Sequence, residues 1–156
     1  MRKHRLLIPV LVGLVSTAAW SQSNEIIDSL LAQERASLGP TAYLVLSAAE
    51  LLDQGATVEQ AFAELQSKPW GFAKSSIDDE VELGAFAALV MKAFSMRGGI
   101  MYTILPGKRY AARELAWRGF VQGNTAPGRT LSGRDVTHIL GKVLESLGQR
   151  KEEVQS

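Results

Sequence analysis

The chain has 156 residues, carries 17 Lys and Arg against 16 Asp and Glu, and contains two histidines and no cysteine. The missing cysteines exclude a disulfide framework, and so few histidines argue against a transition-metal site of the usual His/Cys kind. The length suffices for one hydrophobic core, so we expect a single compact domain.

The first 23 residues have the pattern of a secretory signal peptide. A basic stretch at residues 2–5 is followed by an apolar run at residues 6–15 and by small residues at 16–19. This is the order of the charged, hydrophobic and cleavage regions of such peptides. The apolar run is shorter than the ~20 residues that span a bilayer. We therefore predict cleavage near Ser21 and an exported protein, periplasmic or secreted, with no stable membrane span afterwards. An uncleaved N-terminal anchor is the alternative.

The charge of the remaining chain is unevenly distributed. Residues 1–23 hold three of the 17 basic residues and no acidic one, which leaves 14 against 16, a net charge of −2. Residues 24–90 hold eleven acidic and three basic residues, whereas residues 91–156 hold eleven basic and five acidic ones. The two halves therefore carry −8 and +6. Such an asymmetry bears on partners rather than on fold.

Residues 24–56 are predicted to form an N-terminal helical segment. Apolar residues recur on one face of residues 24–36, which predicts a helix there. Gly39 and Pro40 break the chain, and residues 41–52 are almost continuously apolar. A buried strand and a buried helix both fit such a run, but its length and its alanines favour a helix.

Two copies of one unit follow, fifty residues apart, at residues 57–98 and 107–148. Each copy has a short helix, a turn with an aromatic residue, a loop and a longer capped helix. The matching positions are Phe86 with Val136, Leu89 with Ile139, Val90 with Leu140, Lys92 with Lys142, Gly98 with Gly148, and Trp70 with Phe120. An internal period of this length is typical of stacked repeat architectures.

The helices of the two copies are predicted from caps and apolar spacing. In the first copy a capping box at Thr57 opens a helix to residue 66, and a second helix spans residues 83–96. In the second copy the helices are residues 109–118 and a final helix that Ser132 caps. A polar tail follows at residues 149–156. We therefore expect an all-α fold, with two tandem helix-loop-helix repeats packed against the N-terminal helical pair.

The second copy, best seen in residues 110–123, resembles the S-layer homology (SLH) module of bacterial envelope proteins. In SLH modules a helix is followed by a glycine, two apolar residues and another glycine, and the next helix opens with a Thr-Arg-Ala-Glu motif. Residues 132–135, with Arg134 one position late, stand at that motif, and residues 82–85 stand there in the first copy. The resemblance covers roughly residues 57–148. It implies binding of cell-wall polysaccharide through the motif arginine, in assemblies of three modules.

The candidate ligand-binding residues lie in the second copy. Its arginines match carboxylates and phosphates through bidentate hydrogen bonds, and its aromatic rings offer stacking surfaces. The predicted binding residues are Arg109, Arg113, Arg118, Arg134, Tyr110 and Trp117. Export makes an anionic glycan, peptidoglycan or an acidic protein surface a better partner than nucleic acid. As the alternative, these basic residues face the acidic first half across an internal or dimer interface.

No catalytic, metal-binding or cofactor-binding residues are predicted. Ser132, Asp135 and His138 lie on one helix, where Ser132 is better explained as its cap. The acids of residues 78–82 fit a helix entry better than a calcium site or a glycosidase pair. The apolar connector at residues 100–105 is either an interaction patch or buried between the repeats.

We therefore expect an exported, non-enzymatic helical repeat protein that binds or scaffolds a cell-envelope component such as peptidoglycan or an anionic glycan. The alternative is a periplasmic subunit or chaperone-like factor that binds a protein partner on the connector and the basic face. An enzyme that acts on a glycan with Asp79 and Glu82 is the third hypothesis.

Overall fold

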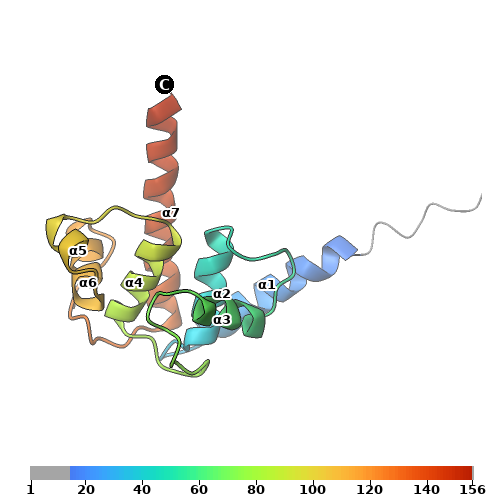
Figure 1. The fold of residues 1–156 in the computed structure, drawn as a ribbon. Coiled ribbons are helices and arrows are strands. Elements are labelled where there is room, and N and C mark those ends of the chain that lie inside the picture. The colour runs from blue at the N-terminus through green and yellow to red at the C-terminus, as the bar shows by residue number, and fades with distance from the viewer. Residues whose placement is uncertain (1–14, 156) are drawn as a thin grey trace, which may run out of the picture.

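The computed structural model describes the backbone of residues 15–155 and the side chains of residues 23–150 and 152. The predicted all-α fold is confirmed, because these residues form helices and two isolated bridges between loops (Figure 1). The helices are α1 (Val15–Leu31), α2 (Leu38–Ala48), α3 (Val58–Ser67), α4 (Leu83–Ala93), α5 (Ile100–Ile104), α6 (Lys108–Trp117) and α7 (Gly133–Gln155).

The N-terminal helix α1 crosses the region where cleavage is predicted, while residues 1–14 of the predicted signal peptide lie outside the described residues. The side chains of α1 that the structure describes begin at Ser23, and they contact the rest of the molecule. Leu30 is fully buried, and the hydroxyl groups of Ser23 and Tyr43 lie 2.8 Å apart. Within the described range, no helix has both the length and the hydropathy that a bilayer span requires.

The tandem repeats appear as two pairs of helices with a constant offset. α3 and α6 have the same length and begin fifty residues apart, at Val58 and Lys108. α4 and α7 likewise begin fifty residues apart, at Leu83 and Gly133. The predicted capping box at Thr57 is present at the start of α3. α7 continues through the predicted polar tail to Gln155.

The aromatic residue that follows the first helix of each repeat is Phe72 in one copy and Phe120 in the other. Both are buried, and both follow a glycine with positive φ, Gly71 at 88° and Gly119 at 76°. The sequence alignment instead pairs Trp70 with Phe120. The turn after α3 is two residues longer than the turn after α6. The buried aromatic residue of the first repeat therefore stands at position 72 and not at position 70, where the fifty-residue offset places it. Trp70 packs at the edge of the core.

The segment before α2 is a third copy of the segment that leads into α4 and α7. Ala36, Val81 and Leu131 each lie two residues before a helix, and their backbones form a closed ring. The Val81 N–H donates to the Ala36 carbonyl (2.9 Å), and the Leu131 N–H to the Val81 carbonyl (2.8 Å). The Ala36 N–H completes the ring by donating to the Leu131 carbonyl (2.8 Å). The helices α2, α4 and α7 therefore start around one approximate threefold axis.

The helices α2 and α4 also end in the same way. Glu50 (φ 58°) and Ser95 (φ 49°) take up the left-handed conformation after their helices. The next residue in each case, Leu51 or Met96, donates its N–H to the carbonyl five residues earlier, at 2.9 Å and 2.8 Å. This is the hydrogen-bond pattern of a Schellman C-cap. The offset between these two ends is 45 residues rather than fifty, so the fifty-residue comparison misses the third copy.

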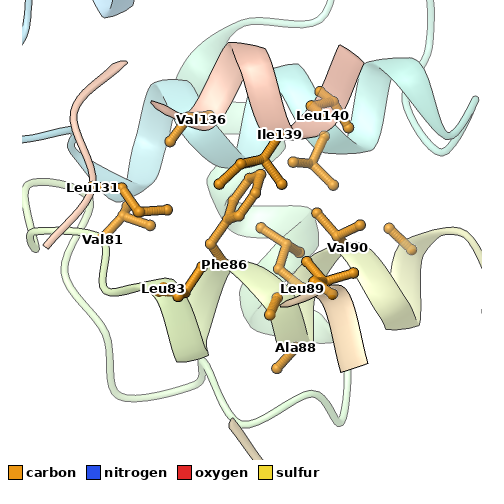
Figure 2. Packing of buried hydrophobic residues seen from close by; sticks show 14 of the residues in the cluster. Val81, Leu83, Phe86, Ala88, Leu89, Val90, Leu131, Val136, Ile139 and Leu140 are labelled. Atoms are coloured by element: carbon orange, nitrogen blue, oxygen red, sulfur yellow. The ribbon is translucent and has the colours of Figure 1, made fainter. Parts of the chain in front are cut away.

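The core lies between α2, α4 and α7. Figure 2 shows Phe86 of α4 pointing toward Val136 and Ile139 of α7, with Val81 next to Leu131. The apolar positions predicted for these helices are buried from Phe86 to Ala93 in α4 and from Val136 to Val143 in α7, whereas Phe94 and Leu144 are partly exposed. Each fully buried large apolar side chain contributes about 1.5–3 kcal/mol to folding. These three helices form the frame on which the others pack.

The remaining helices pack on the outside of this frame. α3 packs on α2, α6 packs on α4, and α1 contacts both α2 and α7. The short helix α5 packs on α6, and in Figure 1 these two helices form one edge of the molecule, opposite α1. This edge carries most of the residues that the sequence singled out for binding.

Candidate functional site

The apolar connector between the repeats is exposed, so the expectation that it is buried between them is wrong. It forms α5, and none of its residues is buried. The exposed fractions are 78% for Ile100, 50% for Met101, 65% for Ile104 and 54% for Leu105. With Trp117 of α6 these make up five of the eight exposed large hydrophobic residues in the described part of the chain. We call the exposed side chains of residues 97–117 the α5–α6 surface.

A buried ion pair fixes α5 against α6. The Oε1 atom of Glu114 accepts a hydrogen bond from Nε of Arg118 at 2.9 Å, and both side chains are largely buried. The Oε2 atom accepts from the Gly99 N–H at 3.0 Å, directly before α5. The Arg118 guanidinium also donates to the Arg97 carbonyl. Arg118, one of the predicted binding residues, therefore holds the chain before α5 in place.

A pocket of about 300 Å³ lies between α5 and α6 and brings three of the predicted binding residues together. Tyr110, Arg113 and Trp117 line one side, and Tyr102 lines the other. The Trp117 ring is 83% exposed and gives the pocket an open edge. Burial raises the pKa of Tyr102 above its usual value, so its hydroxyl stays neutral and can donate a hydrogen bond.

The other predicted binding residues lie outside this pocket. Arg109 is exposed one helical turn before Arg113, so both face the same side of α6. Arg134 is exposed on the first turn of α7. The sequence analysis did not single out Glu114 and Gly99, although both help to hold α5 against α6. Glu114 lies four residues before Arg118, which predicts a pair, but nothing in the sequence indicates that Gly99 comes close.

The exposed charges of the α5–α6 surface have one sign. Arg97, Arg109 and Arg113 are exposed there, whereas Glu114 is largely buried and bonded as described. Among the described residues, no ion pair joins a basic residue of the second repeat to an acid of the first half. The ion pairs therefore give no support to the alternative in which these cations face the acidic half internally.

The acidic residues before α4 line a second, polar pocket of about 330 Å³. Asp79 accepts a hydrogen bond from the Ser76 N–H (2.8 Å), and Glu80 pairs with Arg35 (2.7 Å). The Lys108 ammonium reaches into the same region, 5.8 Å from the Phe72 ring centre. Across the described chain, no group of three or more His, Cys, Asp or Glu residues is placed to hold a metal ion.

Ser132 acts as the cap of α7, as predicted. Its hydroxyl donates to Asp135 Oδ2 (2.9 Å), and the Asp135 N–H donates back to it (3.1 Å). Burial raises the pKa of Asp135, but the hydrogen bonds from Ser132 and the positive charges of Arg129 and His138 outweigh it. The net effect lowers the pKa. The serine and the aspartate are thus engaged with each other at the helix start.

The chain matches no protein-family model, no curated protein and no solved structure. Its function must therefore be inferred from its own residues.

Proposed function

We propose that this chain is an exported, non-enzymatic module that binds an anionic component of the cell envelope through the α5–α6 surface. The observation that carries the proposal is the concentration of exposed apolar side chains and arginines on one short edge. Contiguous exposed apolar surface is uncommon on monomeric proteins and usually marks an interaction site.

The chemistry of the pocket supports an anionic ligand. Arg113 can present its guanidinium bidentately to a carboxylate or a phosphate, and Arg109 adds a second positive charge one turn away. Tyr110 and Trp117 offer flat faces beside that charge. Aromatic rings next to arginine are the residues most often found at the centre of binding surfaces.

The frame of the fold supports a binding role as well. The SLH modules that the sequence resembles work in groups of three, and here three helix starts close into a backbone ring. Two residues weighed for catalysis have local hydrogen-bond partners: Ser132 caps α7, and Asp79 accepts from the Ser76 N–H. Both observations favour a module that presents a fixed surface.

A protein partner is the second candidate. The aliphatic side chains of Ile100 and Ile104 are more than half exposed, and buried interface cores are rich in such side chains and in aromatic residues. A protein with an acidic and partly apolar docking face would match the charge and the apolar side chains of the α5–α6 surface.

Co-sedimentation of the exported chain with an envelope preparation from a double-membrane bacterium tests the proposal. We expect binding at low salt that weakens at high salt, because exposed charge pairs are screened. Arg109→Ala with Arg113→Ala should reduce binding, whereas Lys74→Ala, which removes an exposed charge far from α5 in sequence, should not. A chain that stays in the supernatant at low salt would contradict the proposal.

A further inference from the structure

We propose that the envelope component is the surface of an anionic phospholipid membrane, into which α5 inserts its apolar side chains. This inference rests on the proposed function and names the partner of the same surface. It follows from three properties of the α5–α6 surface: an apolar tip, aromatic residues next to it, and cations of a single sign around them.

The apolar tip consists of α5 and the residue that follows it. Ile100, Met101, Ile104 and Leu105 are at least half exposed, and α5 contributes no buried side chain to the core. Folding therefore does not explain why these positions are apolar. Figure 1 shows α5 at the outer edge of the molecule, where a flat surface can reach it. Shallow insertion of such side chains at the level of the lipid headgroups is how interfacial segments bind membranes.

Three aromatic residues line the pocket next to the apolar tip. Trp117 is the most exposed large hydrophobic residue described, and Tyr102 and Tyr110 line the same pocket. Tryptophan and tyrosine concentrate at the membrane–water boundary because one end of each ring is apolar and the other is polar. Their position here fits a protein that rests at that boundary.

The cations argue for a membrane over a protein or a glycan. Arg97, Arg109 and Arg113 are exposed, and the one acid of the surface, Glu114, is already bonded to Arg118 and Gly99. A protein partner usually presents charges of both signs, and a sugar requires polar groups that match its hydroxyls. A uniformly negative lipid surface requires only positive charge around an apolar tip.

Sedimentation with vesicles tests the inference, using phosphatidylglycerol with phosphatidylethanolamine as the anionic mixture and phosphatidylcholine as the neutral one. We expect binding to the anionic vesicles and little to the neutral ones. Each of Arg109→Ala and Arg113→Ala should weaken binding about fivefold, the effect of one cation near an anionic surface. Ile100→Ser with Ile104→Ser should weaken it more than about tenfold, because two apolar side chains lose their insertion.

Matched controls separate insertion from general loss of hydrophobicity. Leu31→Ser changes a leucine that is 37% exposed on α1 and should leave vesicle binding unchanged. Cleavage near Ser21 removes Trp20, so in the cleaved chain Trp70→Phe leaves Trp117 as the single tryptophan, and its emission should move to shorter wavelength on anionic vesicles. Because Ile100 and Ile104 are exposed, their serine variants should retain the circular dichroism spectrum of the parent chain.

The outcomes distinguish the two proposals. Binding to isolated sacculi without binding to anionic vesicles would overturn the membrane inference and leave the proposed function standing. No binding to vesicles, sacculi or whole envelope would overturn both. Vesicle binding that Ile100→Ser with Ile104→Ser does not weaken would show that α5 does not insert, and would overturn the inference.

Discussion

At the scale of single residues, Glu114 decides where α5 lies. One carboxylate oxygen bonds to Arg118 within α6, and the other accepts the N–H of Gly99 at the entry to α5. Arg118 in turn donates to the Arg97 carbonyl. A charged pair that is largely withdrawn from water is costly to break, because the remaining partner stays buried and unpaired.

Glu114→Gln should therefore destabilise the fold by about 1–3 kcal/mol in urea unfolding, because the amide cannot serve both donors as an acceptor. It should also weaken the proposed binding to anionic vesicles, because α5 loses its attachment. Glu64→Gln is the matched control, since Glu64 pairs with Lys68 at the same helical spacing but is more exposed. It should cost less than about 1 kcal/mol. Equal losses in the two variants would contradict the role given to Glu114.

The cap of α7 predicts a pH dependence. The pKa of Asp135 is lowered in the folded state, so its contribution is present above the unfolded pKa of about 3.9 and is lost as pH falls through the folded pKa. Since the carboxylate is partly exposed, we expect Asp135→Asn to cost no more than about 1 kcal/mol at pH 7. The difference between the two proteins in urea unfolding should shrink as pH falls below the unfolded pKa. A difference that does not change with pH would contradict this account.

At the scale of elements, the long helices could be predicted and their contacts could not. The spacing of Val136, Ile139 and Leu140 predicts α7 and its buried face, and Ser132 predicts its start. α5 has only five residues, too few for an apolar period to appear, so its apolar residues fit burial and exposure equally well. The pocket depends on the packing of α5 against α6, which no local pattern encodes.

The start of α7 also depends on a close approach that is invisible in sequence. A Cβ atom at Gly133 would lie 1.7 Å from the Leu30 carbonyl oxygen, whereas a Cβ at Gly141 of the same helix would meet nothing within 4 Å. Gly133→Ala should therefore destabilise the fold by more than about 2 kcal/mol, because backbone must move.

Gly141→Ala is its matched control and should stabilise the fold by up to about 1 kcal/mol, because alanine restricts the unfolded chain and favours helix. Urea unfolding of both variants measures the contrast. Destabilisation of similar size in both would mean that α1 does not pack against α7 as described.

At the scale of the whole molecule, the N-terminal helices α1 and α2 are part of the same arrangement as the two repeats, because Ala36 belongs to the backbone ring. The ring of Ala36, Val81 and Leu131 requires all three segments, and α3 packs on α2. The sequence predicts the fold class and the tandem repeats because the fifty-residue offset preserves core positions. It does not reveal the third member, because α2 and α4 are 45 residues apart and their capping residues differ.

A fragment that begins at residue 57 should consequently fail to fold cooperatively, since it lacks Ala36 and the buried face of α2. We expect a broad urea transition without a defined midpoint, whereas the chain without the predicted signal peptide should unfold in one sharp step. A sharp transition in the fragment would mean that the two repeats form a domain without the N-terminal pair.

Hydrogen exchange of the chain without the predicted signal peptide, with and without anionic vesicles, tests the proposed binding through the α5–α6 surface most directly. Opening of backbone hydrogen bonds limits the exchange of each amide, so a bound surface gains protection where it is covered. We expect added protection at residues 99–118 and none at the acidic loop of residues 76–82. Protection confined to the acidic loop, or to α1 and α3, would contradict the assignment of binding to the α5–α6 surface.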